Sequence, residues 1–103
     1  MAQFHAYRNP GSKSADRAPY LLDIQSDFVN LKSRVMVMLV RPDHFGPRMR
    51  SLNPLLTVNG ESVVMSPTEM GSIQSRRLGE PVASLAGHRQ DIMAALDLLL
   101  TGI

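Results

Sequence analysis

Residues 54–65, PLLTVNGESVVM, carry the most secure local signal in the sequence. Two short apolar runs are separated by Asn59-Gly60, a pair favoured in type I′ turns because both central positions of such a turn need a positive φ. The pattern predicts a tight antiparallel hairpin. We therefore expect a sheet of short strands joined by turns.

Strand-like segments also precede this hairpin. Residues 3–8 (QFHAYR) alternate apolar and polar side chains, and residues 20–27 (YLLDIQSD) predict a second strand, with Asp27 as a turn residue. Residues 34–40 (RVMVMLV) are continuously apolar apart from the first, which is typical of a strand buried on both faces. We expect the centre of the sheet there.

The segments that follow the hairpin carry mixed signals. Ser66, Pro67 and Glu69 have the spacing of a helix start, which predicts one helical turn ending near Gly71. Residues 74–85 predict a short edge strand because Gly and Pro interrupt them. The connections are too short for crossover helices, so the pattern indicates an antiparallel sheet or small barrel rather than an α/β fold.

The last segment, HRQDIMAALDLLLTGI over residues 88–103, predicts a helix that closes the fold. A helical stripe that we expect to pack on the sheet consists of Ile92, Leu96, Leu99, Leu100 and Ile103. Beside it, Met93, Asp97 and Thr101 form a mixed stripe whose simplest interpretation is a solvated edge.

The composition predicts a single domain over residues 1–103, since 44% of the residues are hydrophobic and 19% are charged. Cysteine is absent, which excludes disulfides and thiolate chemistry and fits a reducing compartment. The sequence has no signal-peptide pattern and no apolar run of about 18 residues, so we expect a cytoplasmic protein without a membrane partner. The net charge of +2 is too small to indicate nucleic acid.

Catalytic and metal-binding patterns are scarce. His5, His44 and His88 lack the spacing of metal ligands, and no phosphate-binding loop or nucleophile elbow occurs, so we expect no catalytic residues, no metal and no cofactor. Arg76-Arg77 could contact phosphates, but three Phe, two Tyr and no Trp leave few rings on which bases could stack. We interpret these arginines as a solvated edge without direct contact to nucleic acid.

The order of motifs along the chain resembles the CcdB family of toxins, from bacterial toxin–antitoxin pairs. The shared segments run from Gln3 to Ile103, with gaps confined to the loops at 8–19 and 41–51. They are QF near the start, LDIQSD (22–27), RVMVMLV, NPLLTVNGES, TEMGSI, LGEPVASL and the final DI..AL.LLLTGI. This coverage is more specific than any one motif.

The resemblance implies a mainly β protein: a small SH3-like antiparallel β-barrel with a C-terminal α-helix, the CcdB/MazF-type toxin fold. It also implies a two-fold symmetric homodimer that acts by binding, not by catalysis. Members of the family are plasmid-maintenance or chromosomal toxins that bind the DNA gyrase A subunit dimer and trap gyrase on cleaved DNA. A CcdA-type antitoxin with a disordered, acidic C-terminal segment neutralises them.

Site residues follow from the same resemblance. The positions implied to bind gyrase are Phe28, Val29, Asp97, Leu100, Thr101, Gly102 and Ile103. Glu61, within the matching hairpin, is implied to bind the antitoxin. The best-known members carry tryptophan where this chain has Thr101, and threonine cannot supply a cation–π contact of about 0.5–2 kcal/mol.

Two other functions remain open from the residues. Related toxins of the same barrel fold are sequence-specific endoribonucleases, for which the basic candidates here are Arg76 and Arg77. A plain interaction module, whose apolar helix end only completes a dimer core, is the third hypothesis.

Overall fold

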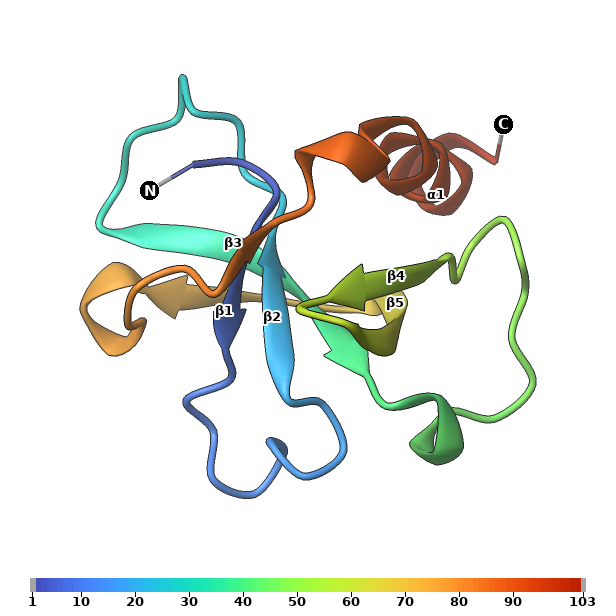
Figure 1. The fold of residues 1–103 in the computed structure, drawn as a ribbon. Helices are drawn as coiled ribbons and strands as arrows, with labels where there is room; N and C mark the ends of the chain where they lie inside the picture. The colour runs from blue at the N-terminus through green and yellow to red at the C-terminus, as the bar shows by residue number, and fades with distance from the viewer. Residues whose placement is uncertain (1, 103) are drawn as a thin grey trace.

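An antiparallel sheet of six strands curls into a nearly closed barrel in the computed structural model, which describes residues 2–102 (Figure 1). Along the chain the strands are β1 His5–Arg8, β2 Tyr20–Asp23, β3 Ser33–Val40, β4 Leu55–Val58, β5 Glu61–Gln74 and β6 Ala83–Ser84. Short 3₁₀ helices are η1 Pro42–His44, η2 Ser75–Arg77 and η3 Ala86–His88, and the one α-helix described is α1 Arg89–Thr101. The small SH3-like barrel with a C-terminal helix is thereby confirmed.

The hairpin at the centre of the sequence has the predicted turn. Asn59 and Gly60 have φ values of 50° and 83°, as a type I′ turn requires. The Asn59 side chain also donates a 3.0 Å hydrogen bond to the carbonyl oxygen of Val82, just before β6. Since β4 and β6 are the two edges of the sheet, this bond helps to close the barrel.

The central strand is the apolar one, as predicted. β3 lies between β5 and β2, and most of its side chains are buried. The barrel core contains Leu22, Val37, Leu56 and Met65, together with apolar side chains from α1. The predicted strand over 74–85 is only two residues long as β6, and it does occupy an edge.

The helical turn predicted after the hairpin is wrong. β5 continues as one strand of 14 residues. Its register with β3 shifts, however, because Val37 pairs with Met70 whereas Met38 pairs with Ser66. The residues between these partners form a bulge, which bends the strand around the barrel.

The residues that resembled a helix start have other roles in this bulge. Pro67 is buried, and its missing N–H costs nothing because no residue of β3 pairs with it. Glu69 accepts two hydrogen bonds of 2.8 and 3.1 Å from the Arg17 guanidinium. This ion pair fastens the bulge to the loop that joins β1 and β2.

Helix α1 packs on the barrel over a narrower face than predicted. Ile92, Ala95 and Leu96 are its buried residues, so two members of the predicted stripe are confirmed. Leu99 and Leu100 are exposed instead, because the core-facing arc ends before the last turn of the helix. Met93 packs partly against the core and is not a solvated edge residue.

A glycine caps the C-terminal end of α1. Gly102 has a φ of 77°, and its N–H donates to the carbonyl oxygen of Leu98 at 3.0 Å, so it terminates α1 in the left-handed conformation that glycine adopts readily. Ile103 lies outside the described residues. Over residues 2–102, no helix combines the length and the apolar character needed to cross a membrane.

Candidate partner-binding site

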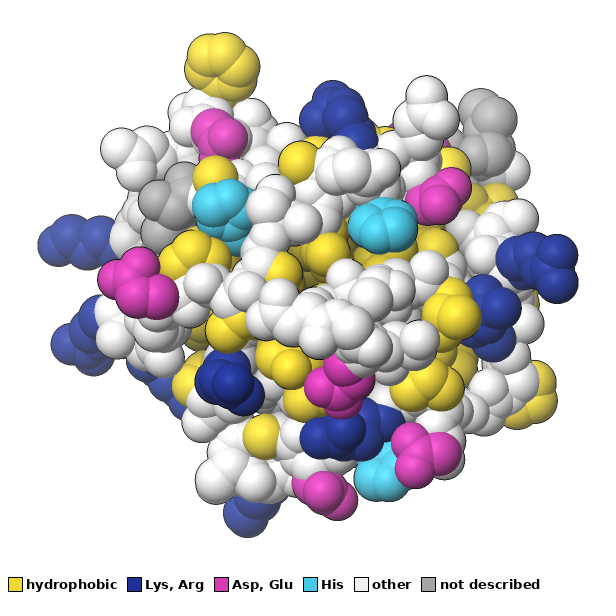
Figure 2. All heavy atoms as spheres, in the orientation of Figure 1, with side chains coloured by type: hydrophobic (Ala, Val, Ile, Leu, Met, Phe, Trp, Pro, Cys, Tyr) yellow, Lys and Arg dark blue, Asp and Glu magenta, His cyan; other side chains and the backbone are white. Residues whose placement is uncertain are grey.

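A loop with exposed apolar side chains joins β2 to β3. We call residues 26–32 the tip loop. Phe28 is fully exposed, and Val29 and Leu31 are also exposed. An isolated hydrophobic side chain protrudes at the upper left of Figure 2, where the connection between β2 and β3 lies in Figure 1. Exposed apolar side chains gathered on one loop favour contact with another macromolecule.

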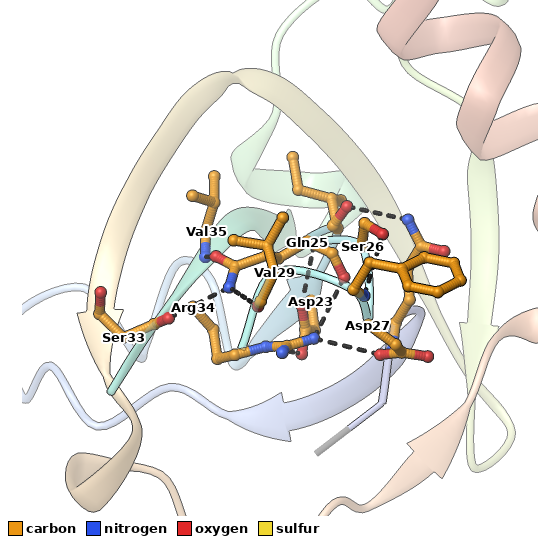
Figure 3. Close-up of polar contacts among 11 residues, drawn as sticks. Asp23, Gln25, Ser26, Asp27, Val29, Ser33, Arg34 and Val35 are labelled. Carbon is orange, nitrogen blue, oxygen red and sulfur yellow. Dashed lines mark hydrogen bonds and ion pairs between the residues drawn. The ribbon is translucent and has the colours of Figure 1, made fainter. Parts of the chain in front are cut away.

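A buried ion pair anchors the base of this loop (Figure 3). The Arg34 Nε donates to Asp23 Oδ2 at 2.8 Å, and the two side chains are only 4% and 0% exposed. The Arg34 Nη2 donates to the Gln25 carbonyl oxygen at 3.1 Å and lies 3.4 Å from Asp27 Oδ1. Burial alone would lower the pKa of Arg34, but its bonds to Asp23 and Asp27 outweigh burial and raise it. The guanidinium therefore stays charged.

The Gln25 amide spans the two ends of the tip loop. Its Nε2 donates to the carbonyl oxygens of Val29, at 2.7 Å, and Ser33, at 3.3 Å, and its Oε1 accepts from the backbone N–H of Val35 at 3.0 Å. The backbone N–H of Gln25 in turn donates to Asp23 Oδ1 at 3.0 Å. These bonds explain why strand β2 ends at Asp23, before the predicted boundary, and why the chain then turns.

The beginning of the chain braces the same loop. The backbone N–H of Gln3 donates to Asp27 Oδ1 at 2.8 Å, and its side-chain Nε2 donates to the Ile24 carbonyl oxygen at 3.1 Å. Asp27 lies in a turn, as predicted. Sequence reasoning assigned no role to Gln3, Gln25 or Arg34. A signal for these roles was present, because each of the three is a polar residue inside a shared motif. The clearest was Arg34, an arginine at the start of an otherwise apolar strand.

The other residues predicted to bind a partner lie at the end of α1. Asp97, Leu100, Thr101 and Gly102 are all exposed, and Leu100 is 72% exposed. The Thr101 hydroxyl donates to the carbonyl oxygen of Asp97 at 2.7 Å, within the helix. Both this group and the tip loop lie above the strands in Figure 1. No hydrogen bond or ion pair between described residues joins the two groups.

Glu61, at the start of β5, connects three segments. Its Oε2 lies 2.6 Å from Arg41 Nη1, and its Oε1 accepts from the Tyr20 hydroxyl at 3.1 Å. The Arg41 Nε donates to the carbonyl oxygen of Asp16 at 2.9 Å. Burial raises the pKa of Tyr20, and the hydrogen bond to Glu61 raises it further. The carboxylate is thus engaged within the protein.

The geometry defines a small antiparallel β-barrel with a closing helix and a braced loop of exposed apolar side chains. Within residues 2–102, no three His, Asp or Glu side chains are placed to hold a metal ion. The family model of the CcdB protein matches residues 3–102, nearly the whole chain. The chain belongs to the CcdB family, and it is a toxin of a toxin–antitoxin system.

Proposed function

We propose that this toxin binds the DNA gyrase A subunit dimer and holds gyrase on cleaved DNA. The observation that carries the proposal is the exposure of the side chains at the family's gyrase-binding positions, Phe28 and Leu100 above all. The barrel core does not use them, and exposed apolar side chains of this size favour burial in a partner.

The action proposed is binding, not catalysis. An endoribonuclease needs a base, an acid and a phosphate-binding group close together. In the described part of the chain, Arg76 bonds only to the Gln74 side chain, at 3.0 Å, and neither Arg76 nor Arg77 is paired with a carboxylate or a histidine. The ribonuclease alternative therefore has the weaker support.

The assembly proposed is a homodimer of a single-domain chain, because a two-fold symmetric toxin presents its binding patch twice to a symmetric target. An antitoxin with a disordered, acidic C-terminal segment neutralises it. Since the Glu61 carboxylate already pairs with Arg41, we expect Glu61 to act on the antitoxin by positioning Arg41. The site of action is the cytoplasm, where gyrase works.

Removing Gly102 and Ile103 tests the proposal. The shortened chain should lose the ability to kill cells and should unfold at nearly the same temperature, since the described part of the segment adds only the Gly102–Leu98 hydrogen bond. A shortened chain that still kills would show that the helix end is not the effector.

Incubation of the purified protein with total RNA tests the alternative, because cleavage at defined sites would favour a ribonuclease.

A further inference from the structure

A groove of about 950 Å³ adjoins the tip loop. It lies between the tip loop, the start of β3 and the segment where β5 passes into η2. The backbone N–H of Ser75 donates to the Lys32 carbonyl oxygen at 2.8 Å, so these segments are in direct contact. The lining residues that matter here are Asp27, Leu31, Lys32, Arg34 and Arg76.

The accessible charge of this groove is positive. Arg34 is neutralised by its buried partner Asp23, so Asp27, whose side chain is 60% exposed, contributes one negative charge, which the two cations Lys32 and Arg76 outnumber. Lys32 and Arg76 are exposed, and among described residues neither forms an ion pair. Lys and Arg side chains protrude along the left edge of Figure 2, over the end of β5 and η2, and they outnumber the acidic side chain that lies among them.

An apolar side chain lies at the lip of this basic groove. Leu31 is 61% exposed, and it is only three residues from Phe28. Their Cα atoms are therefore at most about 11 Å apart, and one partner surface can contact both side chains. The hydrogen bonds of Gln25 and Arg34 hold the loop at its base, which lowers the entropy cost of ordering the loop on binding.

We propose that the tip loop and the basic groove form one composite docking surface. Leu31 enters an apolar pocket of the gyrase A subunit beside Phe28, while Lys32 and Arg76 pair with carboxylates at the rim of that pocket. This inference rests on the proposed function and adds three contact residues to it. A protein partner fits this surface because the aliphatic Val29 and Leu31 are exposed beside Phe28, and aliphatic side chains gain from burial in a protein pocket but offer no ring on which a base can stack.

Leu31→Ala tests the apolar half of the surface, with binding measured to purified gyrase A subunit without DNA. The variant should bind about tenfold more weakly, because an exposed anchor is lost without disturbing the core. Leu55→Ala is the matched control, since Leu55 is 49% exposed on β4, and it should bind within about twofold of the wild type. Both variants should unfold at the wild-type temperature.

The double variant Lys32→Glu/Arg76→Glu tests the charged half, with Lys13→Glu/Arg50→Glu as a control of equal charge change at exposed positions. The association rate of Lys32→Glu/Arg76→Glu with gyrase A should fall at least about tenfold at low salt. The difference from the wild-type rate should shrink as salt rises. The control should show a much smaller loss.

The inference is overturned if Phe28→Ala loses binding whereas Leu31→Ala and the double variant bind like the wild type. It is also overturned if the double variant is impaired only when DNA is present, since the cations would then contact phosphates. If the wild type fails to bind gyrase A at all, the proposed function fails, and this inference fails with it.

Discussion

At the base of the tip loop, Arg34 carries a charge that is almost wholly removed from solvent. Its partner Asp23 is fully buried and accepts a further hydrogen bond from the Gln25 backbone N–H, and Arg34 Nη2 donates to the Gln25 carbonyl oxygen. A buried pair of this kind adds little net stability, yet loss of one partner leaves an uncompensated charge. The Arg34–Asp23 pair instead holds the base of the tip loop in a fixed conformation.

Asp23→Ala should therefore destabilise the protein by about 3 kcal/mol, because the buried Arg34 guanidinium would keep only the longer, 3.4 Å contact with the exposed Asp27 carboxylate as its counter-charge. The free energy of unfolding in urea measures this loss. Asp16→Ala is the control, since the Asp16 side chain is exposed, and it should change stability by at most about 0.5 kcal/mol. Equal stability of the two variants would contradict the anchoring role of Asp23.

At the scale of the elements, β5 shows how strand pairing overrides local sequence signals. Ser66, Pro67 and Glu69 have the spacing of a helix start, but the segment pairs with the central strand and absorbs the extra residues in a bulge. Sequence reasoning succeeded at Asn59-Gly60 because the turn is decided by the φ of two adjacent residues. It failed at the bulge because the deciding partners, β3 and Arg17, are distant in the chain.

The ion pair at the bulge predicts a pH dependence of stability. Partial burial alone would raise the pKa of Glu69, but hydrogen bonds from Arg17 and Ser66 outweigh it and lower the pKa. The unfolded chain therefore takes up this proton at a higher pH than the folded protein. The stabilisation is present above the ordinary carboxyl pKa and is lost as pH falls through the lowered value.

Glu69→Gln removes this contribution. From about pH 6 to about pH 3, the wild type should lose more unfolding free energy than the variant, because only the wild type has this proton to take up. Urea unfolding at a series of pH values measures the difference, and the other carboxylates act equally in both proteins. Parallel pH profiles would show that the Arg17–Glu69 pair contributes nothing.

On helix α1, Leu96 is buried whereas Leu100 is exposed, and the proposed role of Leu100 in binding can be tested separately from packing. Leu96 is buried, so Leu96→Ala should cost about 2–5 kcal/mol of stability. Leu100→Ala should change stability by at most about 0.5 kcal/mol while weakening binding to gyrase A. Thermal unfolding and a binding titration separate the two effects. A strongly destabilised Leu100→Ala would mean that Leu100 belongs to the core.

At the scale of the whole molecule, the sequence predicted the barrel, its central strand and its closing helix, because each depends on local periodicity or on the order of motifs. It could not predict the basic groove, because Lys32 and Arg76 are distant in the chain and meet only through the pairing of β3 with β5. The brace around Gln25 was missed because Gln25 lies after the end of β2, and its side chain reaches Ser33 and Val35 of β3 only once the loop between the two strands has turned.

A DNA cleavage assay shows whether this toxin acts on gyrase as proposed. Purified toxin is incubated with gyrase and supercoiled plasmid, and the reaction is stopped with detergent and protease. Linear DNA should accumulate with wild-type toxin and should not accumulate with the chain lacking Gly102 and Ile103. Plasmid left uncleaved by a wild-type toxin that is folded and kills cells would contradict the proposed action on gyrase.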